Sequence, residues 1–304
     1  MNAQVFLDDL ISEGGPLPLS SGMQHYAAGA NYYNPHLLSL ARQRRLTPPI
    51  PAPPQTFPSC SPGVLASGAR VSRLCPVEMQ REVWRLSDFV LQKTLYEGYS
   101  SSVTQAYDKV SGISVALKIY HKQRLSELNR AQVEREISIH LGLQHMHIIQ
   151  MYAAWEDNAR YYLIQELAEE GDVFNEVHRR GGQMTEKAAV SLVLQPFLAA
   201  LHYLHTRDII HRDIKPENLL FAHGKQIKVA DFGLAIDHSV ERPVTRAGTL
   251  DYMAPEVVIC PSKRYPNENK ENVNLAYTDQ VRLCSQMFSL SLPSPSPSHV
   301  HVCL

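Results

Sequence analysis

One short run, His211-Arg212-Asp213-Ile214-Lys215-Pro216-Glu217-Asn218, constrains the fold and the chemistry of this chain more than any other feature. Its polar residues suit phosphoryl transfer, which needs an acceptor hydroxyl beside a carboxylate and a phosphate whose charge is offset. Asp213 can accept the proton of that hydroxyl, Lys215 can steady the moving phosphate, and Asn218 can bind a metal ion. The run therefore predicts a catalytic loop.

Two further motifs follow in the order that such chemistry requires. Asp231-Phe232-Gly233 supplies a second carboxylate for Mg²⁺, and Ala254-Pro255-Glu256 ends the loop that begins there. A single tripeptide of this kind arises often by chance, whereas the ordered set almost never does. Together the motifs predict that the chain binds ATP with Mg²⁺ and transfers phosphate.

A strand that precedes these motifs carries a lysine suited to phosphate binding. Apolar residues alternate over residues 113–120, which is the period of a half-buried strand, and Ala116 and Lys118 point to the same side. The small Ala116 leaves room for a flat base, while Lys118 can reach phosphate oxygens. Glu136, 18 residues later on a helix predicted over 126–143, can pair with Lys118 and hold it in place.

The remaining periodicity favours strands first and helices afterwards. We expect a strand over 161–167, a helix over 186–205 with a kink at Pro196, and short strands at 219–221 and 227–229. This order predicts an α+β fold of two lobes, a small β-rich N-lobe followed by an incomplete helical C-lobe.

Proline content marks the ends of the folded part. Eleven of the 20 prolines precede Trp84, and Ser-Pro repeats follow Ser289. Because proline fixes φ and lacks a backbone donor, both ends are predicted to be disordered arms. The predicted parts are an arm over 1–83, a catalytic domain over 84–281 with lobes at about 84–165 and 169–281, and an aberrant Ser/Pro-rich tail over 282–304.

Charge and cysteine content argue against several classes of protein. The formal net charge is −1 at pH 7, so no overall field favours nucleic acid as a partner. Five cysteines without paired spacing indicate free thiols in a reducing compartment. We find no basic-then-apolar leader and no apolar run of membrane length, so we expect an intracellular chain without membrane insertion.

The ordered motifs resemble those of the eukaryotic protein kinases from Leu86 to Val281. Lys215 and the pair Gly248-Thr249 are similar to the serine/threonine branch of that family. More narrowly, the chain resembles the Aurora kinases, and most of all the Aurora-like kinases of algae. That likeness rests on Trp84-Arg85-Leu86-Ser87-Asp88-Phe89, Asp108-Lys109-Val110-Ser111-Gly112, Val115-Ala116-Leu117-Lys118 and Gly248-Thr249-Leu250-Asp251-Tyr252.

The resemblance implies further residues of an ATP and Mg²⁺ site. Adenine would bind at a hinge through the Glu166 carbonyl and the Ala168 amide, and Asp172 would bind the ribose. Val103 and Leu220 would sandwich the base together with Ala116. The complete ATP set is Gly98, Val103, Ala116, Lys118, Glu136, Glu166, Leu167, Ala168, Asp172, Glu217, Asn218, Leu220 and Asp231, of which Asn218 and Asp231 would also hold Mg²⁺.

The same resemblance implies how the site would be regulated and what it would act on. Thr245 would be an activation-loop phosphorylation site read by Arg212, with a plain loop hydroxyl as the alternative. Glu217 and Asp172 would favour protein substrates with basic residues near the phosphosite. Spindle, centrosome or flagellar roles and an activating partner protein enter through the resemblance as well. The implied catalytic set is Asp213, Lys215, Asn218 and Thr249, with Thr249 bridging Asp213 and Lys215.

Three positions depart from the family pattern. Of the glycine-rich loop G-x-G-x-x-G only the middle glycine, Gly98, is present, which predicts weaker nucleotide binding. Gln165 precedes the hinge where a large apolar residue is usual, and His140 occupies a packing position beside Phe232. Either residue would lower activity or require an activating partner, or else each is a satisfied buried polar group.

The family pattern breaks near the end of the chain. Arg282 stands where the family has an aspartate, and the residues after it lack the expected tryptophan and glycine. We therefore expect a C-lobe that is truncated. Two hypotheses follow: an active serine/threonine kinase related to the cell cycle or the cilium, or a truncated, catalytically impaired protein that binds nucleotide or acts as a scaffold.

Overall fold

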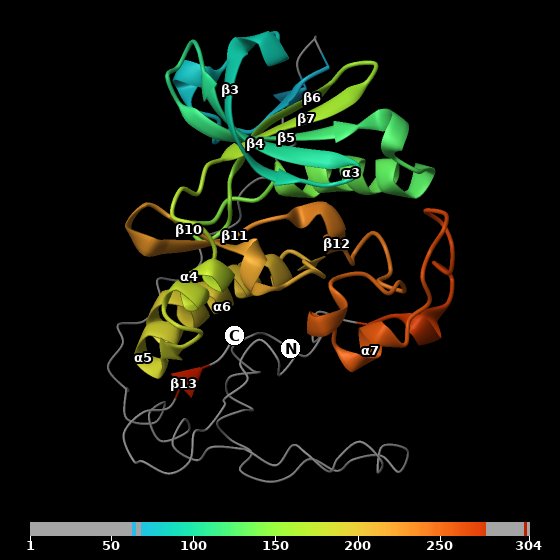
Figure 1. Cartoon of the computed structure of the whole chain (residues 1–304). Helices are drawn as coiled ribbons and strands as arrows, with labels where there is room; N and C mark the ends of the chain where they lie inside the picture. Colours follow the sequence, from blue (N-terminus) through green and yellow to red (C-terminus); the bar gives the residue numbers. More distant parts are fainter. Residues whose placement is uncertain (1–62, 65–67, 278–300, 303–304) are drawn as a thin grey trace, which may run out of the picture. The chain divides into compact units, whose positions relative to one another are not determined.

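Figure 1 shows the computed structural model of the chain, which describes residues 63–64, 68–277 and 301–302. Residues 1–62 of the predicted N-terminal arm lie outside the described part, and so does Arg282. Residues 68–277 form a β-rich N-lobe followed by a lobe with most of the helices. The predicted α+β fold of two lobes is thereby confirmed.

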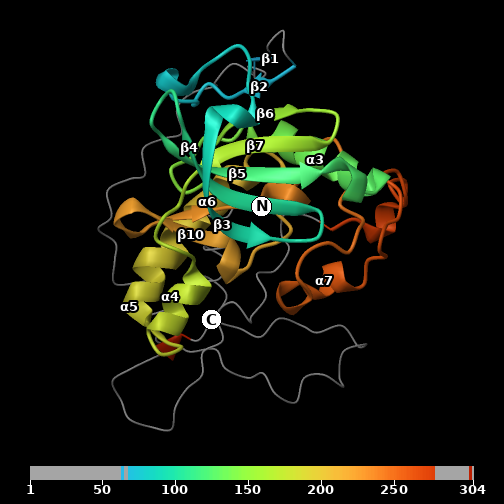
Figure 2. The same ribbon diagram turned by 45° about the horizontal axis from the view of Figure 1, so that its top comes forward.

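The N-lobe is built around one antiparallel sheet, whose strands follow the order β1-β2-β6-β7-β5-β4-β3 (Figure 2). The strands are β1 (Gly63–Val64), β2 (Arg70–Val71), β3 (Phe89–Glu97), β4 (Ser101–Asp108), β5 (Ser114–His121), β6 (Met151–Glu156) and β7 (Arg160–Glu166). The strands predicted over 113–120 and 161–167 are confirmed as β5 and β7. These two strands form the middle of the sheet and are buried over most of their length.

Helix α3 (Glu127–His140) packs against this sheet and confirms the helix that the sequence predicts there. Ser126 begins it as an N-cap, because its hydroxyl accepts a hydrogen bond from the Asn129 backbone N–H at 3.1 Å. Val133 and Ile137, one turn apart, are buried in a cluster with residues of β6 and β7. This packing fixes the helix relative to the strand that carries Lys118.

The folded part begins earlier than the sequence predicts. Proline content predicts a disordered arm up to residue 83, but residues 68–83 pack on the N-lobe, where β2 pairs with β6 and both Cys75 and Met79 are buried. Pro76 does not oppose this packing, since it precedes the 3₁₀ turn Val77–Met79, where a missing backbone donor costs little. Burial of its apolar side chains therefore favours a folded segment, although its proline content predicts disorder.

The C-lobe combines helices with pairs of short strands. Its helices are α4 (Val173–Arg179), α5 (Glu186–Ala188), a π-helical segment (Ala189–Leu194), α6 (Gln195–His205) and α7 (Pro255–Val258). Its strand pairs are β8 (Met184–Thr185) with β13 (His301–Val302), β9 (Ile209–Ile210) with β12 (Ile236–Asp237), and β10 (Leu219–Ala222) with β11 (Gln226–Val229). The hairpin β10-β11 confirms the two short strands that the sequence predicts around Gly224.

Short 3₁₀ turns connect these elements in both lobes. They are Val77–Met79, Leu86–Asp88, Lys122–Arg124, Pro216–Asn218, His223–Lys225, Phe232–Leu234, Leu250–Tyr252 and Val273–Leu275. Two of them, Pro216–Asn218 and Phe232–Leu234, belong to the motifs that predict the active site.

The predicted helix over 186–205 is confirmed, together with its irregularity at Pro196. The chain widens into the π-helical segment Ala189–Leu194 immediately before α6, and the Gln195 N–H donates to the Val190 carbonyl five residues back. Proline lacks the N–H of a regular turn and its ring crowds the preceding turn, which accounts for the wider turn.

The same helical run departs from the expectation that the chain has no apolar run of membrane length. Glu186–His205 has a mean hydropathy of 1.3 and is the one helix of the described part that is long and apolar enough to cross a bilayer. Phe197, Leu201 and Leu204 on it are nevertheless buried in the C-lobe core. A core helix of a folded lobe passes the same test of length and composition, and with 33% of the apolar window buried the packing accounts for part of this run.

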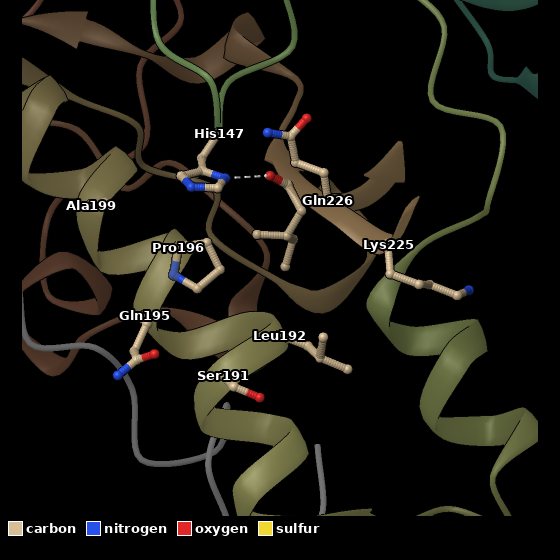
Figure 3. Close-up of a pocket in the computed structure, with 9 residues that line it drawn as sticks. His147, Ser191, Leu192, Gln195, Pro196, Ala199, Lys225 and Gln226 are labelled. Atoms are coloured by element: carbon tan, nitrogen blue, oxygen red, sulfur yellow. Dashed lines mark hydrogen bonds between the residues drawn. The ribbon is translucent and has the colours of Figure 1, made fainter. Parts of the chain in front are cut away.

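A cavity of about 420 Å³ opens between this helical run and β11 (Figure 3). His147, Leu192, Pro196 and Ile227 line it, and His147 Nδ1 lies 3.0 Å from the Ile227 carbonyl oxygen. None of the lining residues belongs to the predicted active site.

Candidate active site

One face of the N-lobe sheet gathers the side chains predicted to meet the base and the phosphates. Val103 lies opposite Lys118 across β4 and β5, and Ala116 lies opposite Gln165 across β5 and β7. Directly paired residues share a face, and so do residues two apart on a strand, so these four side chains line one surface. Ala116 and Lys118 are both buried there.

Lys118 pairs with two carboxylates from different elements. Its Nζ donates to Glu136 Oε1 of α3 at 2.9 Å and to Asp231 Oδ1 at 2.8 Å. Glu136 is fully buried, whereas the Asp231 side chain is 48% exposed. The structure therefore brings together the lysine, the helix carboxylate and the Asp-Phe-Gly carboxylate that the sequence predicts.

Charge governs the protonation of this cluster. Burial alone would lower the pKa of Lys118, but the carboxylates of Asp231 and Glu136 raise it well above its ordinary value. The Lys118 ammonium in turn holds the pKa of Asp231 far below its ordinary value. Lysine and aspartate are therefore both charged at neutral pH, as phosphate and metal binding require.

The catalytic loop forms a second network around Asp213. Thr249 Oγ1 donates to Asp213 Oδ1 at 2.8 Å, and Lys215 Nζ donates to Thr249 Oγ1 at 2.9 Å. Lys215 Nζ also lies 3.0 Å from Asp213 Oδ2, and Asn218 Nδ2 donates to the same oxygen at 3.0 Å. The bridge through Thr249 that the resemblance implies is thus present in the geometry.

Gly248 lets Thr249 approach the catalytic loop this closely. Its φ is +120°, a conformation that residues with a side chain rarely adopt, and a Cβ there would collide with the Arg212 carbonyl oxygen. The glycine before Thr249 is therefore required by a close backbone approach.

Oxygen ligands suited to Mg²⁺ occur at two predicted positions. Asp231 offers a charged carboxylate on a left-handed backbone with φ of 60°, and buried Asn218 offers an amide oxygen on the catalytic loop. In the described part of the chain no group of three or more His, Cys, Asp or Glu is arranged to hold a metal by itself. Mg²⁺ in phosphate-transfer sites is held by one or two protein oxygens together with substrate phosphates, so these residues fit it.

The predicted hinge follows the end of β7. The Glu166 carboxylate is engaged by residues outside the hinge, since Lys228 Nζ lies 2.9 Å from its Oε1 and the Gln150 N–H donates to its Oε2. Leu167 and Ala168 continue from it as half-buried chain outside any helix or strand. The backbone of Glu166-Leu167-Ala168 is thereby left as the part of the hinge that can meet a base.

The remaining predicted ATP residues occupy different environments. Asp172 caps α4, where its carboxylate accepts hydrogen bonds from the Asn175 N–H and side-chain amide, each at 2.7 Å. Leu220 is half-buried on β10, and Glu217 is exposed on the turn before that strand. Gly98 lies in the loop after β3, where a Cβ would meet the Tyr96 hydroxyl at 2.6 Å, so a side chain there would displace Tyr96.

The two unusual polar residues near the site are buried and only partly satisfied. His140 stacks on Phe232 with ring centroids 4.5 Å apart, and its Nε2 lies 2.6 Å from the Ile149 carbonyl oxygen. Among the described residues, however, His140 Nδ1 and Gln165 Nε2 are buried without a hydrogen-bond partner. The interpretation of His140 and Gln165 as buried groups with all their hydrogen bonds satisfied is therefore wrong for the described part of the chain.

We expect acid to destabilise the chain through His140. Burial lowers its pKa to about 4, from an ordinary value of about 6.5. Between these values the unfolded chain binds one more proton than the folded chain. The stability that depends on neutral His140 is therefore complete above about pH 6.5 and is lost as pH falls through about 4. Urea unfolding at several pH values should show a shallower acid slope for His140→Leu than for the wild type.

The control for this measurement is His202→Leu, which removes an exposed imidazole from α6. Lys118, Asp231 and His211, the titratable groups that act on the His140 ring, are unchanged in both variants. Equal acid slopes for the wild type and His140→Leu would contradict the expectation.

Thr245, the predicted phosphosite, is linked to Arg212 through Tyr277. The Thr245 hydroxyl is buried, and no described residue hydrogen-bonds it. Tyr277 Oη donates to the Thr245 carbonyl at 3.0 Å, while Arg212 donates to Tyr277 Oη at 3.5 Å and to the Leu234 carbonyl at 2.5 Å. A single side chain, that of Tyr277, thus connects Arg212 to the backbone of Thr245.

A charge cluster that the sequence does not predict lies nearby. Glu241 accepts from Arg135 of α3 at 2.6 Å, and its other oxygen lies 3.5 Å from Lys263 Nζ and 3.7 Å from Lys270 Nζ. These cations hold the pKa of Glu241 below its ordinary value, against the opposite effect of burial. The cluster ties the activation loop to the helix that carries Glu136.

Tyr120 is a further residue of the site that the sequence analysis overlooks. Its hydroxyl donates to Glu136 Oε2 at 2.7 Å in the buried interior of the N-lobe. One signal was available, because Tyr120 stands two residues after Lys118 and therefore on the same face of β5.

A β-rich lobe that holds a lysine between two carboxylates, joined to a helical lobe with an Asp-Lys-Asn catalytic loop, defines the class of two-lobed phosphotransferases. Residues 89–272 match the family described as "Protein kinase domain". The chain therefore belongs to the protein kinase family.

Aurora kinases are among its relatives within that family. It is 40% identical over 178 residues to an Aurora kinase of Encephalitozoon cuniculi, a match that covers 58% of this chain and 65% of the relative. It is 36% identical over 182 residues to Aurora kinase B-A of Xenopus laevis, covering 60% and 50%. It is 39% identical over 179 residues to an Aurora kinase of Schizosaccharomyces pombe, covering 58% and 50%.

These matches confirm the resemblance to eukaryotic serine/threonine kinases of the Aurora type. The chain spans about half to two thirds of the length of these relatives. The narrower likeness to algal Aurora-like kinases stays a prediction.

Proposed function

We propose that this chain transfers the γ-phosphate of ATP to serine and threonine hydroxyls of proteins. The observation that carries the proposal is the network in which Thr249 Oγ1 joins Asp213 and Lys215. This network fixes a carboxylate for the acceptor hydroxyl beside an ammonium group for the transferring phosphate. Membership of the protein kinase family implies the use of ATP and, typically, of Mg²⁺.

The residues of the two networks would share the work of transfer. Asp213 would orient the acceptor hydroxyl and take its proton, while Lys215 would offset charge on the phosphate as it moves. Lys118, held by Glu136, would contact the phosphates of ATP. Thr249 supports this arrangement because it bonds to both Asp213 and Lys215.

Metal and base binding would use the residues around these networks. Mg²⁺, when bound, neutralises phosphate charge, and Asn218 and Asp231 would hold it. The hinge backbone at Glu166 and Ala168 would bind adenine. Val103, Ala116 and Leu220 would enclose the base, Leu167 would continue the hinge, and Gly98, Asp172 and Glu217 would complete the contacts.

The acidic residues near the site favour basic protein substrates. Glu217 is exposed on the turn that ends the catalytic loop, where its charge is available to a substrate. Asp172 is half-buried at the start of α4 and is engaged by Asn175. Glu217 is therefore the better supported of the two as a reader of basic residues.

Thr245 is the proposed regulatory phosphosite. Its hydroxyl lacks a partner among the described residues, and Arg212 is linked to its backbone carbonyl through the Tyr277 hydroxyl. A phosphate on Thr245 would compete with Glu241 for Arg135 and would pair with Arg212. We propose further an intracellular location, an activating partner protein, and roles at the spindle, centrosome or flagellum, all of which rest on the resemblance to Aurora kinases.

The alternative of an impaired scaffold protein has no specific observation in its favour. The predicted catalytic residues Asp213, Lys215, Asn218 and Thr249 lie in the described part and are joined in one network, which supports an active site. The active enzyme is therefore the function that we propose.

A phosphate-transfer assay on the full chain tests this function. With MgATP and a histone mixture as a basic acceptor, we expect labelled phosphate on serine and threonine and none on tyrosine. Chelation of Mg²⁺ by EDTA should abolish transfer, and excess Mg²⁺ should restore it, because phosphate charge is otherwise left unneutralised. Phosphotyrosine as the main product, or undiminished transfer in EDTA, would overturn the proposal.

A further inference from the structure

The two oxygens of the Glu136 carboxylate are held by different side chains. Lys118 Nζ donates to Oε1 at 2.9 Å, and Tyr120 Oη donates to Oε2 at 2.7 Å. Glu136 is 0% exposed and Tyr120 is 9% exposed, so water does not replace either donor readily. The orientation of this carboxylate is therefore set by two residues of β5, one charged and one neutral.

The Tyr120 hydroxyl lies where three parts of the site meet. Its own strand carries Lys118, whose Nζ lies 5.1 Å from the centroid of the Tyr120 ring. Its partner Glu136 belongs to α3. The third part is the Asp-Phe-Gly turn, because a Cβ built on Gly233 would lie 3.6 Å from Tyr120 Oη and 3.5 Å from Glu136 Oε2. The Tyr120 hydroxyl is thus close to strand β5, helix α3 and the Asp-Phe-Gly turn at once.

We propose that Tyr120 is a positioning residue, which holds the Glu136 carboxylate of α3 in place for Lys118 during phosphate transfer. This inference rests on the proposed kinase function. Lys118 divides its Nζ between Glu136 and Asp231 and would also have to serve the phosphates of ATP. The bond from Tyr120 does not depend on that division, so it keeps Glu136 in place when Lys118 is drawn to phosphate.

The chemistry of the hydroxyl suits this role. Burial raises the pKa of Tyr120 far above its ordinary value, with the charge of Glu136 acting in the same direction. The phenol therefore stays protonated and remains a donor throughout the neutral range. Hydrogen bonds to buried charged groups are among the stronger ones in proteins.

The test removes this one hydroxyl and compares it with a matched hydroxyl elsewhere in the sheet. Tyr120→Phe keeps the ring and loses the donor to Glu136. Tyr162→Phe is the control, because Tyr162 Oη on neighbouring β7 donates to a carboxylate oxygen of Asp157 at 2.8 Å, outside the predicted site. We expect kcat to fall about tenfold in Tyr120→Phe and to change little in Tyr162→Phe, with an unchanged KM for the protein substrate in both.

A double-mutant cycle separates positioning from a general loss of stability. If Tyr120 acts through Glu136, then Tyr120→Phe should have almost no further effect on kcat in a Glu136→Ala background, where its acceptor is absent. Equal kcat losses in Tyr120→Phe and Tyr162→Phe would overturn the inference, and so would a full tenfold loss added on top of Glu136→Ala.

A binding measurement keeps this inference separate from the proposed function. Absence of transfer by the wild type would count against the proposed function. Calorimetry with a non-hydrolysable MgATP analogue would then still compare the variants, because Lys118 is held for the phosphates before any transfer. Weaker analogue binding by Tyr120→Phe than by Tyr162→Phe supports the role of Tyr120, and equal binding overturns it.

Discussion

Asp213→Asn is expected to lower kcat for phosphate transfer by about 10²–10⁴-fold, the range typical for loss of a general base. The amide keeps the shape of the carboxylate and can still accept from the Thr249 hydroxyl, which now donates to Asp213 Oδ1. It cannot take a proton, and it places a donor next to Lys215 Nζ, which lies 3.0 Å from Asp213 Oδ2. Binding of MgATP should change little, because the proposed nucleotide contacts lie on other residues.

The matched control for this prediction is Asp157→Asn. Asp157 lies in the turn between β6 and β7, where it accepts from the backbone N–H groups of Ala159 and Arg160. The same change of carboxylate to amide there should leave transfer intact. Steady-state assays with labelled ATP and calorimetric titration with an ATP analogue give both readouts. Substantial transfer by Asp213→Asn would refute its proposed role as the base.

Local patterns in the sequence are sufficient to predict the elements that carry the chemistry. Alternation on β5 predicts that Ala116 and Lys118 share a face, and the four-residue apolar spacing of α3 predicts its buried side. The irregularity near Pro196, which the structure shows as a π-helical segment, follows from the covalent structure of proline. Each of these inferences depends on residues within one or two turns of chain, which is why a single sequence reveals them.

Contacts between distant segments are what the sequence does not reveal. Residues 68–83 fold because β6, some 80 residues later, offers an edge for β2 and an apolar surface for Met79. Glu241 pairs with Arg135 across 106 residues of sequence, and nothing in the local pattern of either indicates the other. Tyr120 could be placed on the face of Lys118 by alternation, but its bond to Glu136 depends on how α3 docks against the sheet.

The second large effect is expected from removing the ammonium group of Lys118. Lys118→Met should abolish measurable transfer and also destabilise the fold by about 3 kcal/mol, since it leaves the buried Glu136 carboxylate without its cation. Asp231, the other partner, is 48% exposed on its side chain and can be rehydrated, so it adds little to this cost. Urea unfolding measures the stability, and the labelled-phosphate assay measures the activity.

A second substitution separates the two consequences of losing Lys118. Lys118→Met combined with Glu136→Gln removes the unpaired charge, so most of the lost stability should return while transfer stays absent. Lys228→Met is the matched control, because the buried Lys228 ammonium pairs at 2.9 Å with the Glu166 carboxylate, which is 22% exposed. That variant should lose stability yet still transfer phosphate. A Lys118→Met variant as stable as the wild type would show that Lys118 does not stabilise Glu136. A double variant that regained transfer would show that Lys118 is not the phosphate contact. The geometry supports both proposed roles, since one ammonium group joins the buried helix carboxylate to the exposed aspartate of the site.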